Sequence, residues 1–178
     1  EEKHARQAAR FSLVLFDQLA GLHGLGERDR RILLAAALLH EIGGFISFKR
    51  HHKHSLYIIS QSELPGFSPE EMLMIANVAR YHRKSPPSFL HEQFTRLSAG
   101  EQERVCRMAA LIRLADALDR EHLQKVSDLR VEIRGGKAVL LIRGTGDLLL
   151  ERWALQNKSD YFNRLFNMQV ILDVQEGG

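Results

Sequence analysis

Apolar residues recur three or four positions apart through the first two thirds of the chain, which is the spacing of amphipathic helices. The first apolar stripe consists of Ala8, Phe11, Leu15, Leu19 and Leu22. Gly24 and Gly26 are expected to end that helix, and a second helix is predicted from about Glu27 to Glu41. A further helix is predicted from Leu56 to Ser62, after a basic loop at residues 49–54.

Two capping boxes mark the starts of the next predicted helices. Ser68 is followed by Pro69 at the first helical position and by Glu71 three residues after the cap. Ser98 is followed by Glu101 in the same way. These patterns predict helices that begin near residues 69 and 99, each with an apolar stripe facing a core.

After residue 127 the apolar period changes to two, which is typical of strands. Apolar and charged residues alternate over Leu129–Arg134, and the apolar segment Ala138–Ile142 follows Gly135-Gly136. A glycine pair between two alternating segments favours the tight turn of a β-hairpin. The helical part of the chain is therefore expected to end near residue 127, where a small sheet begins.

A helix from about Leu148 to Phe166 and a strand from Met168 to Val174 are predicted to complete the chain. The predicted fold class is mostly α. Its predicted organisation is a helical domain at residues 1–126 and a small C-terminal α+β appendage at residues 127–178.

Composition excludes several classes of protein. Hydrophobic residues make up 44% of the 178 residues and charged residues 26%, which is typical of a folded globular chain. The single cysteine excludes a disulfide or zinc–thiolate cluster within one chain. No apolar run approaches the ~20 residues that span a bilayer, so a cytoplasmic protein without a membrane partner is expected. The net charge of +3 indicates no specific nucleic-acid partner.

Four residues of metal-ligating types extend the apolar stripes of four different predicted helices. They are His4, His40, His82 and Asp116. Helices packed around one core would aim these side chains at its interior, where imidazoles and carboxylates suit a divalent metal. The alternative is structural: each histidine is a hydrogen-bonded core residue, and Asp116 accepts from a nearby arginine.

A basic run at residues 49–54 favours a polyanion nearby. Lys49, Arg50 and Lys53 lie there among three histidines, and Arg83-Lys84 forms a second basic pair. Lysine and arginine meet phosphates through charge-assisted hydrogen bonds. The alternative interpretation is a solvated basic surface without a ligand.

Three long stretches resemble the C-terminal HD-type region of the exopolyphosphatase and guanosine pentaphosphate phosphatase family, the Ppx/GppA proteins. They are LLHEIGGFISFKRHHKHSLYIISQSELPGF, IANVARYHRKSPP and LIRLADALDR. Together with the β-rich end, the resemblance covers nearly the whole chain. It implies an HD-type helical domain for residues 1–126.

Comparison with broader HD phosphohydrolases implies a primary metal-ligand set and no assigned catalytic residue. The set is His4, His40, Glu41 and Asp116, with His54 and His82 similar to the added histidines of two-metal members. Glu41 departs from the usual aspartate, and its extra methylene displaces the carboxylate. A divalent metal of unspecified identity is the cofactor that this set implies.

The resemblance also implies what the chain does. In the family, terminal phosphate is released by an actin-like region with Gly-rich phosphate loops, and nothing in this chain resembles that region. The chain is expected to be a separately made domain or a stand-alone relative without the main catalytic centre. Its expected roles are binding of polyphosphate or guanosine pentaphosphate through Lys49, Arg50, Lys53, Arg83 and Lys84, and assembly as a homodimer.

Two rival functions remain open at this point. One is an autonomous metal-dependent phosphohydrolase that acts on a nucleotide, with a metal-bound hydroxide as nucleophile. The other is a purely structural dimerisation module. Metal content separates the first rival from the other two functions, and polyphosphate affinity separates the substrate-binding domain from the structural module.

Overall fold

Helix α7 (Ala99–Ala117) lies at the centre of the fold. Four helices pack on it, namely α1 (Glu2–Gln18), α3 (Glu27–Leu39), α5 (Pro69–Arg80) and α8 (Leu149–Phe166). The computed structural model describes residues 1–176. Every residue from Met108 to Ala117 is buried, so this helix has no solvent-facing side there. A helix enclosed on all sides needs an apolar surface all round, and the sequence MAALIRLADA provides it except at Arg113 and Asp116. Those two polar residues face the functional site.

Three of these helices precede α7 in the chain. They are α1 (Glu2–Gln18), α3 (Glu27–Leu39) and α5 (Pro69–Arg80). Both predicted capping boxes are present: the Ser68 and Ser98 side chains accept from the backbone N–H groups of Glu71 and Glu101. The first predicted helix breaks at Leu19 into α1 and the short α2 (Ala20–His23). Gly24 ends α2 in the left-handed conformation, at a φ of 62°.

The predicted basic loop at residues 49–54 and the predicted start of the next helix at Leu56 are wrong. A 3₁₀ turn, η1 (Ile42–Phe45), leads to α4 (His51–Ser60), which begins inside that run. Arg50 precedes the helix in the left-handed conformation. The helix begins early because its inward face already starts at His51 and His52, whose side chains are buried. The short α6 (Glu92–Thr95) connects α5 to α7.

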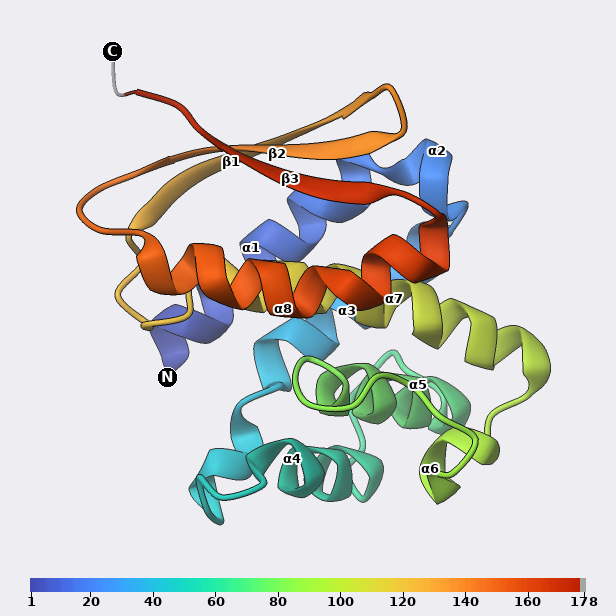
Figure 1. The fold of residues 1–178 in the computed structure, drawn as a ribbon. Helices are drawn as coiled ribbons and strands as arrows, with labels where there is room; N and C mark the ends of the chain where they lie inside the picture. Colours follow the sequence, from blue (N-terminus) through green and yellow to red (C-terminus); the bar gives the residue numbers. More distant parts are fainter. Residues whose placement is uncertain (177–178) are drawn as a thin grey trace.

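A three-stranded sheet lies over one side of the helices (Figure 1). Strands β1 (Val126–Arg134) and β2 (Lys137–Gly144) form the predicted antiparallel hairpin, with Gly135 and Gly136 at positive φ in its turn. Helix α8 (Leu149–Phe166) then crosses beneath the sheet and leads to β3 (Gln169–Val174), which pairs in parallel with β2. The order is β1-β2-β3.

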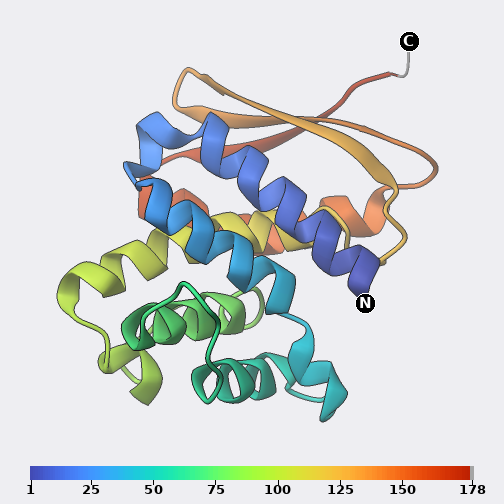
Figure 2. The ribbon, with the colours of Figure 1, turned by 180° about the vertical axis from the view of Figure 1, so that it is seen from behind.

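The sheet and the helices share one apolar core. Figure 2 shows α1 running along the inner side of the sheet, where Phe11 and Leu15 join a buried cluster that also holds Val131, Leu140 and Phe162. The mostly helical fold with a small C-terminal α+β part is confirmed. The division at residues 126 and 127 stays a prediction. Among the described residues, no helix is both long and apolar enough to cross a membrane.

Candidate metal centre and anion cleft

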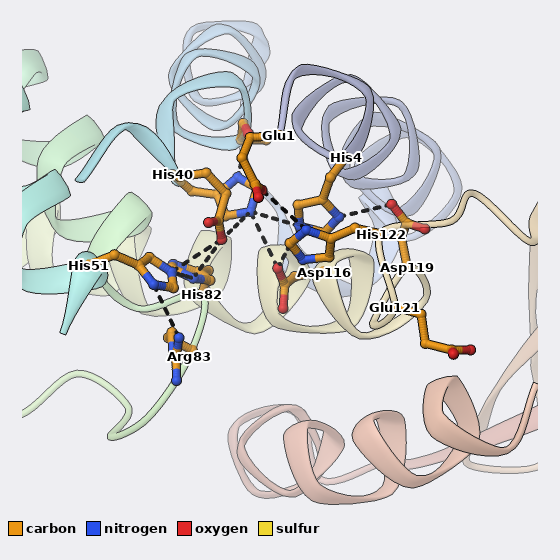
Figure 3. A network of polar contacts seen from close by, with 12 residues as sticks. Glu1, His4, His40, His51, His82, Arg83, Asp116, Asp119, Glu121 and His122 are labelled. Atoms are coloured by element: carbon orange, nitrogen blue, oxygen red, sulfur yellow. Dashed lines mark hydrogen bonds and ion pairs between the residues drawn. The ribbon is translucent and has the colours of Figure 1, made fainter. Parts of the chain in front are cut away.

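Helices α1, α3 and α7 deliver imidazoles and carboxylates to one point (Figure 3). His4 comes from the first turn of α1, His40 and Glu41 from the end of α3, and Asp116 from the last turn of α7. The His4 Nε2 atom lies 3.1 Å from Asp116 Oδ1 and 3.2 Å from His40 Nε2. His40 Nε2 lies 3.3 Å from the same Asp116 oxygen. The convergence predicted from separate apolar stripes is therefore present in the fold.

Glu41 joins this cluster to a second one. Its Oε1 atom lies 3.1 Å from His51 Nε2 and 3.5 Å from both His82 Nε2 and His40 Nε2. His51 and His82 face each other through their Nε2 atoms at 3.1 Å. One carboxylate thus stands between two groups of possible ligands.

The turn that carries Glu41 is fixed by a close packing contact with α4. The Ser55 hydroxyl donates to the His40 carbonyl and accepts from the Gly43 N–H, at 2.7 and 2.9 Å. A Cβ atom at Gly43 would lie 2.1 Å from the His51 carbonyl oxygen, so only glycine permits this approach. The sequence HEIGG therefore positions Glu41 through a glycine contact as well as through helix α3.

Hydrogen bonds at the far side of each ring direct the free nitrogen into the cluster. The Nδ1 atoms of His40 and His82 each lie 2.6 Å from a backbone carbonyl, and that of His4 lies 2.9 Å from Asp119 Oδ2. Carbonyl and carboxylate oxygens only accept, so each Nδ1 donates. In the neutral ring the Nε2 atom then carries the lone pair, which is the arrangement that metal-ligating histidines adopt.

The donor set fits a divalent cation. Nε2 lone pairs that face one another and face carboxylate oxygens at 3.1–3.5 Å repel unless a proton or a metal lies between them. The ligand atoms of His4, His40, Glu41 and Asp116 all lie within 4.8 Å of one another. Those of Glu41, His51 and His82 meet the same limit. Imidazole and carboxylate groups are ligands that first-row divalent metals accept.

Electrostatics hold the carboxylates ionised. Burial alone would raise the pKa of Asp116, but the Lys158 ammonium and the hydrogen bonds from His4 and His40 keep that pKa well below its usual range. Burial lowers the pKa of His4, yet hydrogen bonds to Asp116 and Asp119 outweigh it and raise the pKa to about 9. Burial lowers the pKa of His82 well below the ordinary histidine value. His82 is therefore a neutral ring with a free Nε2.

Lys158 is a site residue that sequence reasoning missed. It extends from α8 and pairs directly with Asp116. Its helix was predicted, but its inward direction follows from the packing of α8 on α7, which no local pattern reports. The other missed site residues are His51, Arg113, Asp119, Arg120 and His122. The His122 ring stacks on His4 with centroids 3.6 Å apart.

A cleft of about 680 Å³ opens directly above the cluster. Glu41, Asp116, His51 and His82 contribute to its lining. Its walls carry five permanent cations, namely Arg83, Lys84, Arg113, Arg120 and Lys158. Five cations against two carboxylates favour anions in this space.

Arg113 supports the wall of the cleft from below. Its guanidinium donates to the carbonyls of Tyr81 and Lys84, both at 3.0 Å. Lys84 adopts a φ of 58°, a conformation that non-glycine residues seldom use. Backbone strain of this kind persists where surrounding contacts fix it, often at functional sites. Arg113 therefore holds the Arg83-Lys84 pair at the mouth of the cleft.

Seven of the predicted site residues fall into two sets in space. His4, His40, Glu41, His82 and Asp116 come together in the cluster, and Arg83 and Lys84 line the cleft. His54 belongs to neither ligand group found among residues 1–176, where His51 takes a place beside Glu41 and His82 instead. Lys49, Arg50 and Lys53 are exposed and do not line the cleft.

Comparison with known proteins identifies the same family as the three sequence stretches that resemble Ppx/GppA proteins. Residues 1–163 match the family model described as Ppx/GppA phosphatase, domain III. This chain belongs to the Ppx/GppA phosphatase family. The resemblance predicted from the sequence is thereby confirmed at the level of the family.

Three relatives within the Ppx/GppA family bear the same name, guanosine-5'-triphosphate,3'-diphosphate pyrophosphatase. The protein of Vibrio vulnificus (strain YJ016) is 31% identical over 80% of this chain and 28% of its own length. That of Vibrio campbellii (strain ATCC BAA-1116) is 34% identical over 61% of this chain and 22% of its own. That of Pseudoalteromonas translucida (strain TAC 125) is 52% identical over 29% and 10%. The chain thus spans less than a third of these relatives.

Proposed function

We propose that this chain is a polyanion-binding domain of a Ppx/GppA-type phosphatase, which supports hydrolysis of guanosine pentaphosphate or inorganic polyphosphate carried out by an actin-like region. The observation that carries the proposal is the cleft with five cations over two carboxylates. The name shared by the relatives supports guanosine-5'-triphosphate,3'-diphosphate as one candidate substrate.

Two cations of the cleft are free to bind phosphate. Within residues 1–176 the side chains of Lys84 and Arg120 make no hydrogen bond or ion pair. An incoming phosphate would therefore not have to break an existing ion pair with either side chain. A guanidinium and an ammonium also bind phosphate through different geometries, a planar fork and a point charge.

A binding titration tests this role. Arg83→Ala combined with Lys84→Ala should weaken guanosine pentaphosphate and polyphosphate binding about tenfold or more, because two charge-assisted contacts are lost. Arg130→Ala combined with Arg134→Ala removes the same charge from exposed β1 and is the matched control. Calorimetry at increasing salt should show weaker binding throughout. Equal losses in both double variants would mean nonspecific charge attraction and would refute the cleft.

The exposed residues Lys49, Arg50 and Lys53 are proposed to extend the binding path for long polyphosphate. They follow Phe48, which lines the cleft. Alanine at all three positions should weaken binding of long polyphosphate and leave tripolyphosphate binding unchanged, since the short ion remains within the cleft. If long polyphosphate binds the triple variant as tightly as the parent, the run is only a solvated surface.

Assembly as a homodimer is the second part of the proposed role. Leu38, Ile42, Phe45 and Phe48 expose large apolar surface along a groove of about 910 Å³. Phe45 is 98% exposed, and contiguous apolar surface of this kind marks interaction sites. Phe45→Asp should shift a dimer toward the monomer in light scattering. A chain that is monomeric at all concentrations contradicts the dimer.

A metal-dependent phosphohydrolase of the HD type is the second candidate function, and the position of Glu41 between two ligand groups favours it. His4, His40, Glu41 and Asp116 would hold one metal, with His51 and His82 beside Glu41. The metal would supply Lewis-acid polarisation and a water of lowered pKa. Asp119 keeps the His4 ring in place, and Arg83 and Lys84 hold the phosphate.

Elemental analysis after dialysis against Mn²⁺ tests the second candidate. The parent chain should retain metal, and Asp116→Asn should lose most of it, because an amide binds a cation far more weakly than a carboxylate. Phosphate release from a nucleotide should then depend on Mn²⁺. A parent chain that retains no metal would leave polyanion binding as the function of the cleft.

A further inference from the structure

The basic cleft contains an aromatic feature that phosphate binding leaves unused. Trp153, the only tryptophan of the chain, lies on α8, lines the cleft and is 56% exposed. Its large apolar ring faces water in a cleft whose lining carries five cations and one other apolar aromatic residue, Phe48. An indole kept at the mouth of a polar cleft offers a flat surface on which a ring can stack.

Trp153, Asn157 and Lys158 all face the cleft from helix α8. Asn157 follows one turn after Trp153 and also lines the cleft, and Lys158 reaches the floor at Asp116. The five residue steps from Trp153 to Lys158 span about 7.5 Å of helix axis. A ligand lying along this face would therefore meet an aromatic ring at the mouth and positive charge at the floor.

We propose that the cleft binds a nucleoside polyphosphate, with its base stacked on Trp153 and its phosphates against Arg83, Lys84 and Arg120. This inference rests on the proposed anion-binding function and specifies its ligand. A base has an aromatic face for Trp153, while the ribose separates that face from the phosphates. Inorganic polyphosphate has phosphates alone and leaves the indole exposed.

Asn157 gives the base an edge contact in addition to stacking. Its amide is exposed, and it makes no hydrogen bond within the described residues. A carboxamide both donates and accepts, so it can pair with the polar edge of a base. Stacking on the ring of Trp153 and pairing with Asn157 use two neighbouring side chains of the same cleft wall.

Fluorescence titration measures the contact directly, because all tryptophan emission of the chain comes from Trp153. GTP should quench this emission with a saturable curve, and tripolyphosphate should displace GTP with little quenching of its own. Excitation at the red edge of the tryptophan band avoids absorption by the nucleotide.

Variants separate stacking from phosphate binding, with affinities measured by calorimetry. Trp153→Ala should weaken GTP binding about tenfold and leave tripolyphosphate binding unchanged, the size expected for loss of one stacked base. Trp153→Phe should restore most of the GTP affinity because a phenyl ring also stacks. Phe89→Ala, at an exposed aromatic residue outside the cleft, is the control and should change neither affinity.

The outcomes distinguish this inference from the function on which it rests. If both probes bind the parent chain and Trp153→Ala weakens neither, the cleft recognises phosphate only, and base stacking is overturned while the proposed function stands. If neither GTP nor tripolyphosphate binds, both the inference and the proposed function are overturned. Selective loss of GTP affinity in Trp153→Ala, with recovery in Trp153→Phe, supports the inference.

Discussion

Replacing Lys158 with methionine tests whether the Lys158 ammonium compensates the charge of the buried Asp116 carboxylate. Lys158 pairs with Asp116, which also accepts from His4 and lies 3.3 Å from His40 Nε2. Methionine keeps the apolar length of the side chain but removes the charge. Breaking a buried pair by removing one partner costs about 3–5 kcal/mol when the remaining charge is left uncompensated.

The expected cost is smaller here because Asp116 keeps other partners. His4, with a pKa raised to about 9, is protonated at neutral pH and lies 3.1 Å from Asp116. The free energy of unfolding should therefore fall by about 2 kcal/mol in Lys158→Met, below the range for a wholly unpaired charge. Urea unfolding followed by circular dichroism at neutral pH, without divalent metal, measures this change.

Divalent metal should reverse the effect if the site accepts it. Removing the Lys158 ammonium removes a competitor for the Asp116 carboxylate, so Mn²⁺ should stabilise Lys158→Met more than it stabilises the parent. A metal at a hundredfold excess over its dissociation constant adds about 2.7 kcal/mol to the stability of a folded protein. That gain would exceed the loss caused by the substitution.

Lys125→Met provides the matched control, because Lys125 pairs with Glu121 at a more exposed place outside the cluster. The loss of stability in this control should be small because solvent screens the Lys125–Glu121 pair, and the variant should show no response to Mn²⁺. If Lys158→Met loses no more stability than this control, Asp116 does not depend on Lys158 and the reasoning is refuted.

Two further predictions concern stability. Glu71→Gln should cost about 1 kcal/mol at neutral pH, because Arg28 holds the Glu71 pKa at about 2 and the pair is partly screened by solvent. The parent has this stabilisation above pH 4.5 and loses it as the pH falls toward 2. The urea midpoints of parent and variant should therefore converge near pH 2. A difference between the two midpoints that stays constant with pH would contradict the ion pair. Gly43→Ala should cost about 3 kcal/mol or more in thermal unfolding, since its Cβ would overlap the α4 backbone, whereas Gly44→Ala has open space and should cost about 1 kcal/mol or less. Equal melting temperatures for the two alanine variants would show that the Gly43 contact is not required.

The sequence allowed much of the cluster to be predicted because its members continue apolar stripes. A residue on the inward face of a helix is buried wherever that helix packs, so His4, His40, His82 and Asp116 had few places to go except together. Their pairwise distances and the placement of Glu41 between two groups depend on how α3, α5 and α7 cross. Periodicity contains no information on those crossings.

The histidine run shows how a small error in a helix start changes the assignment of a site. A helix that begins at Leu56 leaves His51 and His54 in a loop, and the resemblance to two-metal proteins then selected His54. With α4 beginning at His51, the first turn packs inward and His51 meets Glu41 and His82. The signal that could have revealed this lies in the buried series His52, Ser55, Leu56 and Ile59, which has helical spacing.

The C-terminal part contributes more to the site than its description as an appendage suggested. Helix α8 supplies Trp153, Asn157 and Lys158 to the cleft, although it follows the hairpin in the sequence. It reaches α7 because the helix and the sheet share an apolar core with α1 and α7. Loss of that packing would leave Asp116 without its lysine and remove one wall of the cleft. Polyanion binding is therefore expected to require both parts of the chain, and the helical part alone does not provide a complete site.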